Sequence, residues 1–115
     1  MHDDTDHFVL ICSTCTGTAS ADAVQDRLTD KLPSGFAIRH VACMAGCAHP
    51  ITVGFQAAGK AQYLFGDIQT TQEIEALADF AVQYRHSNDG WTNATDRPRA
   101  LLTKTLSRMP RIGGA

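Results

Sequence analysis

The residues best suited to chemistry in this chain are its four cysteines, which stand in two close pairs. Two residues separate Cys12 from Cys15, and three residues separate Cys43 from Cys47. A thiolate is a soft metal ligand, so two short chelates that meet in the fold would make a four-sulfur site. Sulfur ligation of this kind suits either zinc or an iron–sulfur cluster. The spacing therefore predicts one metal centre held by all four cysteines.

Spacing and loop composition favour a [2Fe–2S] cluster over a zinc ion at this site. A zinc ribbon usually has two Cys-x-x-Cys knuckles about 15–20 residues apart. Here the pairs are farther apart, and the second is Cys-x-x-x-Cys. The small residues Ala45 and Gly46 would let the backbone approach a bulky inorganic core and direct its amides at sulfur. A four-cysteine zinc site in a binding module without redox activity is the alternative.

Three other interpretations of the cysteines fit the sequence less well. Cys12-x-x-Cys15 alone is the pattern of a redox dithiol, but this leaves the second pair unexplained. Structural disulfides are disfavoured in the reducing compartment that we expect for this chain. His49 follows Cys47 by two residues and could be a ligand beside three cysteines, although four cysteines make it unnecessary.

Both cysteine pairs are expected just after strands. The apolar run 8–11 predicts a central strand buried on both faces, and the extended pattern 36–42 predicts a second strand. An amphipathic helix is predicted between them, with Ser20 as its N-cap and an apolar stripe of Ala21, Val24, Leu28 and Leu32. Open α/β sheets tend to carry their sites where such strands end.

The later elements complete one small fold. Alternating apolar residues over 51–57 and 61–65 predict a β-hairpin that turns near Gly59. A capping box of Thr70 and Glu73 begins a second helix, with a stripe of Ile74, Leu77, Ala78, Ala81 and Tyr84. The order predicts a thioredoxin-like α/β fold, β-α-β-β-β-α, with a mixed four-stranded sheet.

The C-terminal region is predicted to be a tail on this domain. We assign residues 1–90 to the domain and residues 91–115 to the tail, which would contain a short basic helix from Pro98 with Leu102, Leu106 and Met109 on one face. This helix is expected to pack on the domain or on a partner. Tyr63, Phe65 and Trp91 are expected to be core residues, with an apolar docking rim as the alternative.

Charge and composition exclude several classes of function. Residues 1–90 carry five Lys/Arg and eleven Asp/Glu, and such an acidic body argues against nucleic acid as the main ligand. No apolar run approaches the roughly 20 residues that cross a bilayer, and the acidic N-terminus is unlike a targeting peptide, so we expect a cytoplasmic protein. No nucleophile–base pattern or phosphate loop is present in the sequence, which predicts an electron carrier and not an enzyme.

The order of elements and cysteines resembles the thioredoxin-like [2Fe–2S] ferredoxins, including the related flavoprotein-associated subunit of respiratory complex I. The sequence Val41-Ala-Cys43-Met-Ala-Gly-Cys47 is similar to their Cys-Leu-Gly-x-Cys loop, whereas the first pair is more closely spaced here. Most specifically, the two pairs with Tyr63-Leu-Phe-Gly-Asp67 and Asp89-Gly-Trp91 look like an uncharacterised family of metal-binding proteins related to those ferredoxins.

The resemblance covers most of the chain and carries functional expectations. It implies one-electron transfer, often by a homodimer, with a reductase or an acceptor enzyme as the redox partner. Relatives with this type of fold are associated with respiratory, tetrapyrrole and cobalamin metabolism.

Overall fold

The computed structural model of this chain describes residues 6–12, 21–41, 51–93 and 96–111. It shows an α/β fold in which two helices accompany one five-stranded mixed sheet. The elements are β1 (His7–Cys12), α1 (Ala21–Thr29), β2 (Phe36–Val41), β3 (Val53–Ala57), β4 (Gln62–Phe65), α2 (Thr71–His86), the 3-10 helix η1 (Arg99–Leu101) and β5 (Thr105–Met109).

The strands lie in the order β2-β1-β3-β4-β5. β1 and β2 are parallel, with His7 opposite Phe36 at one end and Cys12 opposite Val41 at the other. β3 runs antiparallel to β1 and forms a hairpin with β4. The predicted parallel pair, and the hairpin beside it, are therefore confirmed.

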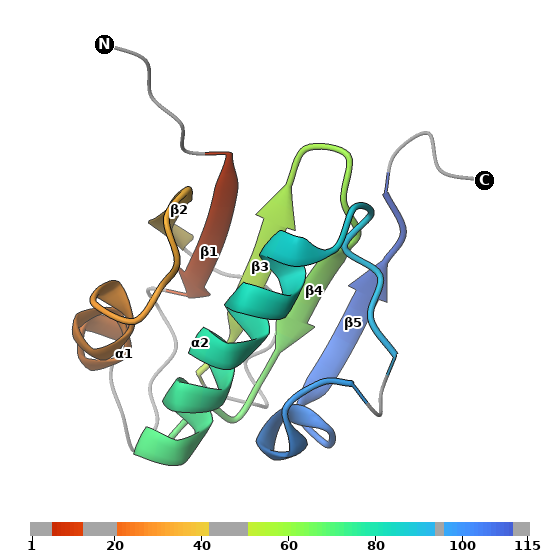
Figure 1. Ribbon diagram of the computed structural model, residues 1–115. Coiled ribbons are helices and arrows are strands. Elements are labelled where there is room, and N and C mark those ends of the chain that lie inside the picture. The colour runs from red at the N-terminus through yellow and green to blue at the C-terminus, as the bar shows by residue number, and fades with distance from the viewer. Residues whose placement is uncertain (1–5, 13–20, 42–50, 94–95, 112–115) are drawn as a thin grey trace, which may run out of the picture.

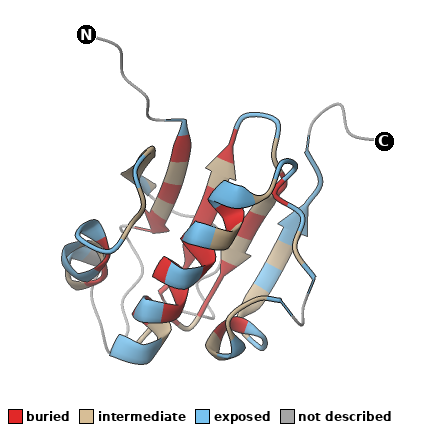
Figure 2. Ribbon diagram, in the orientation of Figure 1, coloured by how far each residue is buried: buried red, intermediate tan, exposed pale blue. Residues whose placement is uncertain are grey.

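Both helices lie on one face of the sheet (Figure 1), and the core is packed between them and the strands. Aromatic rings fill this layer, because Phe80 of α2 sits 4.9 Å from the ring centroids of both Phe55 and Tyr63. Figure 2 shows the buried side of α2 turned toward β3 and β4. Each fully buried ring contributes roughly 1.5–3 kcal/mol relative to an exposed one.

The opposite face of the sheet is less covered than predicted. Phe8 and Leu10 of β1 are only half-buried, while Val9 and Ile11 are fully buried. The expectation of a strand buried on both faces was therefore wrong, because α1 and α2 share the other side. Pairing on both edges still makes β1 a central strand, as predicted.

The predicted start of α2 is confirmed in detail. The Thr70 hydroxyl accepts the Glu73 N–H, and the Glu73 carboxylate accepts the N–H groups of Thr70 and Gln69 at 2.9 and 2.7 Å. Its other oxygen pairs with the Lys104 ammonium at 2.7 Å. Burial opposes ionisation of Glu73, but Lys104 and the two amides outweigh it and hold the pKa of the carboxyl below its ordinary value.

Glu73→Gln should therefore destabilise the protein in a pH-dependent way. Gln can still complete a capping box, so the variant chiefly removes the charge, and we expect a loss of about 1–2 kcal/mol at pH 7. A lowered folded-state pKa means that the ionised carboxyl stabilises the fold at neutral pH. This contribution fades as the pH falls below the ordinary value of 4.5 and through the lowered one.

Chemical denaturation at pH 7 and pH 3 measures this effect, and Glu75→Gln is the matched control. Glu75 lies on the same helix and pairs with Lys31 at 3.7 Å, but both side chains are about half exposed. The control should cost no more than about 0.5 kcal/mol. Equal losses for the two variants, or a Glu73→Gln loss that is unchanged at pH 3, would contradict this role of Glu73.

The C-terminal region corrects the sequence prediction. Instead of a helix from Pro98, it forms η1 and then β5, which pairs antiparallel with β4 and makes the sheet five-stranded, not four-stranded. The stripe of Leu102, Leu106 and Met109 that suggested a helix is exposed, whereas Leu101 is buried. Pairing satisfies backbone groups of β4 that would otherwise form an open edge.

Tyr63 and Phe65 are core residues, as predicted, whereas Trp91 is 43% exposed. α1 buries Val24 and Leu28, and its predicted cap Ser20 lies outside the described residues. None of the helices described in the structure has the length and apolar character to cross a bilayer.

Candidate metal centre at the end of β1

Cys12 is the last residue of β1 and is fully buried. Ile11 before it is fully buried, and so are Ile51, Thr52 and Val53, the stretch across the sheet to which its backbone bonds. The stretches 8–12 and 51–55 carry no charged side chain. Because Cys12 is fully buried, its sulfur is shielded from water at this end of the sheet.

Two other segments meet the backbone of Cys12. On one side it is the parallel partner of Val41, the last residue of β2. On the other side its N–H donates to the Thr52 carbonyl at 3.2 Å. Thr52 is fully buried, and the preceding Ile51 accepts the N–H of Ile68 at 3.2 Å. Cys12 is thus fixed between the end of β2 and the residues that lead into β3.

The backbone around Cys12 thus contacts both stretches that flank the second cysteine pair in the sequence. The segment 42–50 begins directly after Val41 and ends directly before Ile51. Cys43, Cys47 and His49 belong to that segment, and Cys15 belongs to the segment 13–20 that follows Cys12. All four of these residues lie outside the described part of the chain. Within the described ranges, no three His, Cys, Asp or Glu side chains are grouped to hold a metal ion.

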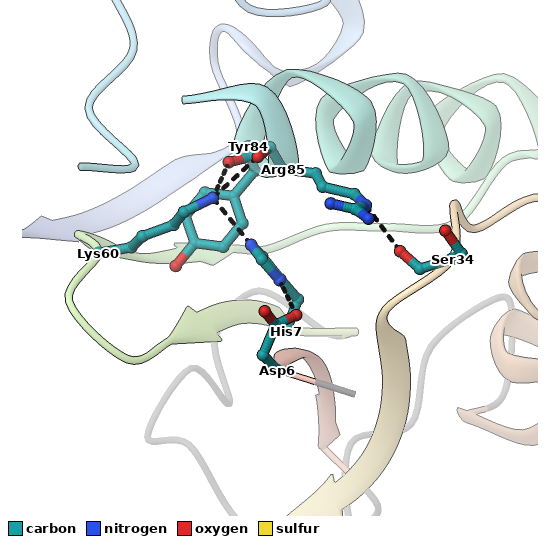
Figure 3. A network of polar contacts seen from close by, with 6 residues as sticks. All are labelled: Asp6, His7, Ser34, Lys60, Tyr84 and Arg85. Atoms are coloured by element: carbon teal, nitrogen blue, oxygen red, sulfur yellow. Dashed lines mark hydrogen bonds and ion pairs between the residues drawn. The ribbon is translucent and has the colours of Figure 1, made fainter. Parts of the chain in front are cut away.

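A second polar cluster lies at the opposite end of β1 (Figure 3). The ring of His7 is buried, with Nδ1 2.6 Å from the Asp6 carboxylate and Nε2 2.8 Å from the Lys60 ammonium. Lys60 also donates to the carbonyls of Tyr84 and Arg85 at 2.7 and 3.1 Å. These carbonyls belong to the last turn of α2.

The geometry of this cluster indicates a structural clamp. An ammonium group has three N–H donors, and the three acceptors around Lys60 use all of them. Burial lowers the pKa of Lys60, with Arg85 acting in the same direction and Asp6 opposing it. The amine is nevertheless occupied by the end of α2 and by β1, so it has no donor left for a substrate.

Sequence reasoning missed this clamp. Of the contacts that His7 makes in it, only the one with Asp6 is local in the sequence. Lys60 lies in the β3–β4 turn, far from His7 in the sequence. The signal that could have found the pair is the register of β1 against β3, which places His7 opposite Ala57 at the start of that turn.

Comparison with known proteins identifies one family. The family described as "Protein of unknown function (DUF1636)" matches residues 9–111, which include all four cysteines. No curated protein and no solved structure was found to match the chain.

Proposed function

This chain belongs to the family of unknown function DUF1636, and we propose that it is a one-electron carrier that holds a [2Fe–2S] cluster on Cys12, Cys15, Cys43 and Cys47. The observation that carries the proposal is the position of Cys12. It lies at the end of the central strand β1, between Val41, after which the segment with the second cysteine pair begins, and the stretch from Ile51, where that segment ends.

Chain length limits how far the other three cysteines can lie from Cys12. Consecutive Cα atoms are about 3.8 Å apart, so Cys15 stays within about 11 Å of Cys12. Cys43 follows Val41 by two residues, and paired strands are about 4.8 Å apart, which keeps Cys43 within about 13 Å. Cys47 is similarly tethered, four residues before Ile51. These limits are compatible with one shared site.

The chemistry of the donor set fits the cluster. Four thiolates are the usual ligands of a [2Fe–2S] centre, and zinc accepts the same atoms. When bound, the cluster would supply a one-electron couple whose potential depends on hydrogen bonds to sulfur and on solvent exposure.

The chain's own residues would shape that site in two ways. Burial of Cys12 excludes water from one of the ligands. The N–H of Cys12 already donates a hydrogen bond to the Thr52 carbonyl. Amide donors to the cluster sulfurs would therefore have to come from other residues of the segments 13–20 and 42–50.

The arrangement of β1 to β4 supports the resemblance to thioredoxin-like ferredoxins. A parallel β1–β2 pair with an antiparallel hairpin beside it is the layout that the resemblance implies. The expected cytoplasmic location, redox partner and homodimer belong to the same proposal. So does the association with respiratory, tetrapyrrole or cobalamin metabolism.

Metal analysis of anaerobically purified protein tests the proposal. We expect about two irons and two acid-labile sulfides per chain, with a red-brown colour that bleaches on reduction with dithionite. A colourless protein with one zinc and no sulfide would contradict it and would favour the zinc-stabilised binding module.

A further inference from the structure

The outer edge of β5 is an open edge of the sheet. β5 ends the strand order, and within the described ranges no other strand pairs with its outer side. Such an edge presents N–H and C=O groups that can pair with another extended chain. Charged side chains protect many such edges, and β5 carries the exposed Arg108, but it also exposes Leu106 and Met109, which are 37% and 58% accessible. Figure 2 shows no buried residue along this strand.

The region around β5 is also positively charged. Residues 91–115 carry five Lys/Arg and one Asp, in contrast to the acidic remainder of the chain. Lys104 is occupied by Glu73. Arg99, Arg108 and Arg111 are exposed. The apolar edge of β5 is therefore flanked by cationic side chains.

Arg108 is held in place on this strand. Its guanidinium carbon lies 3.6 Å from the ring centroid of Trp91, and its Nη1 donates to the Thr92 carbonyl at 3.0 Å. A guanidinium has five N–H donors in one plane, so this contact uses only part of its capacity. Stacking on the indole fixes the plane in advance, and a fixed guanidinium can bind a carboxylate through two parallel hydrogen bonds.

From these observations we infer that the β5 edge binds an extended, acidic segment of a partner protein by strand addition. The backbone of the segment would pair with β5, a carboxylate would bind Arg108, and apolar side chains would contact Leu106 and Met109. A protein segment fits better than a nucleic acid or an anionic membrane. Open strand edges need backbone partners, and the acidic remainder of the chain would repel an extended polyanion. The inference does not depend on the metal centre.

Calorimetric titration of the whole 115-residue chain tests this inference with a short capped peptide of alternating glutamate and valine. We expect saturable binding that weakens with salt, together with a change in the fluorescence of Trp91, which is the only tryptophan in the chain. Arg108→Gln should weaken binding about tenfold or more. Arg111→Gln should weaken it less, because it leaves the stack on Trp91 in place.

Arg39→Gln is the matched control. Arg39 is exposed on β2, the opposite edge strand, and also lies over an aromatic ring, 5.5 Å from the centroid of Phe8. This variant should bind like the parent protein. Two N-methylated peptides add a test of strand pairing. One is methylated at the backbone nitrogens of its glutamates and the other at those of its valines, so each has lost the N–H donors on one side of the extended chain. Only the peptide that has lost the donors facing β5 should lose binding.

Several results would overturn the inference. These are the absence of peptide binding at millimolar concentration, equal binding of a lysine–valine peptide, and equal losses for Arg39→Gln and Arg108→Gln. Unchanged binding of both N-methylated peptides would also overturn it. So would binding of anionic vesicles or duplex DNA in place of the peptide.

Discussion

Replacing Cys12 by Ser is expected to lower the bound iron by at least about tenfold, since even residues that only support metal ligands change affinity 10- to 100-fold. Cys15→Ser, Cys43→Ser and Cys47→Ser should each have the same effect, because one cluster needs all four sulfurs. Iron and sulfide analysis after anaerobic purification measures this loss. A double variant of Cys12 and Cys43 should be no worse than either single variant, as expected of residues that act as a unit.

His49→Ala is the control for this series, and it should retain the iron. Loss of iron in His49→Ala with retention in one cysteine variant would indicate a site of three cysteines and one histidine. Retention of iron in both Cys43→Ser and Cys47→Ser would contradict a four-sulfur site. Circular dichroism separates loss of metal from loss of fold, which matters for Cys12 because it is buried.

Gly90→Ala should be the most destabilising small substitution in the described fold. Gly90 is buried at φ 74°, and a methyl group there would lie 2.9 Å from both the Ala61 nitrogen and a Tyr84 ring carbon. Its carbonyl also accepts the Tyr63 hydroxyl at 2.8 Å, which ties the turn after α2 to the hairpin. Strain and overpacking together should cost about 2–5 kcal/mol.

Thermal denaturation tests this, with Gly59→Ala as the matched control. Gly59 has nearly the same backbone angle, φ 72°, but nothing lies within 4 Å of the added methyl group. The control should therefore lose only the conformational part, about 1–2 kcal/mol. Similar melting temperatures for the two variants would show that Ala61 and Tyr84 yield to the methyl group at little cost.

Features set by neighbouring residues could be predicted from the sequence. The capping box of Thr70 and Glu73 involves residues three positions apart, so its geometry follows from the local pattern. The hairpin and the parallel β1–β2 pair follow from alternation and from the handedness of the crossover. The same logic placed Cys12 directly after a strand over 8–11, and the structure extends that strand by one residue so that Cys12 ends it.

Features set by distant residues could not be predicted in this way. The spacing of Leu102, Leu106 and Met109 fits a helix. The region forms a strand instead, because β5 pairs with the edge of β4 that would otherwise be open. The bond from Cys12 to Thr52 depends on the register of β1 against β3, which no local pattern reveals. The same register explains why Lys60 reaches His7.

The most direct test of the central claim is low-temperature EPR of anaerobically purified protein reduced with dithionite. A [2Fe–2S] cluster on Cys12, Cys15, Cys43 and Cys47 predicts a signal from about one unpaired electron per chain, and this signal should be absent from Cys12→Ser. An EPR-silent protein that contains one zinc ion per chain, with the four cysteines intact, would contradict the proposed electron carrier.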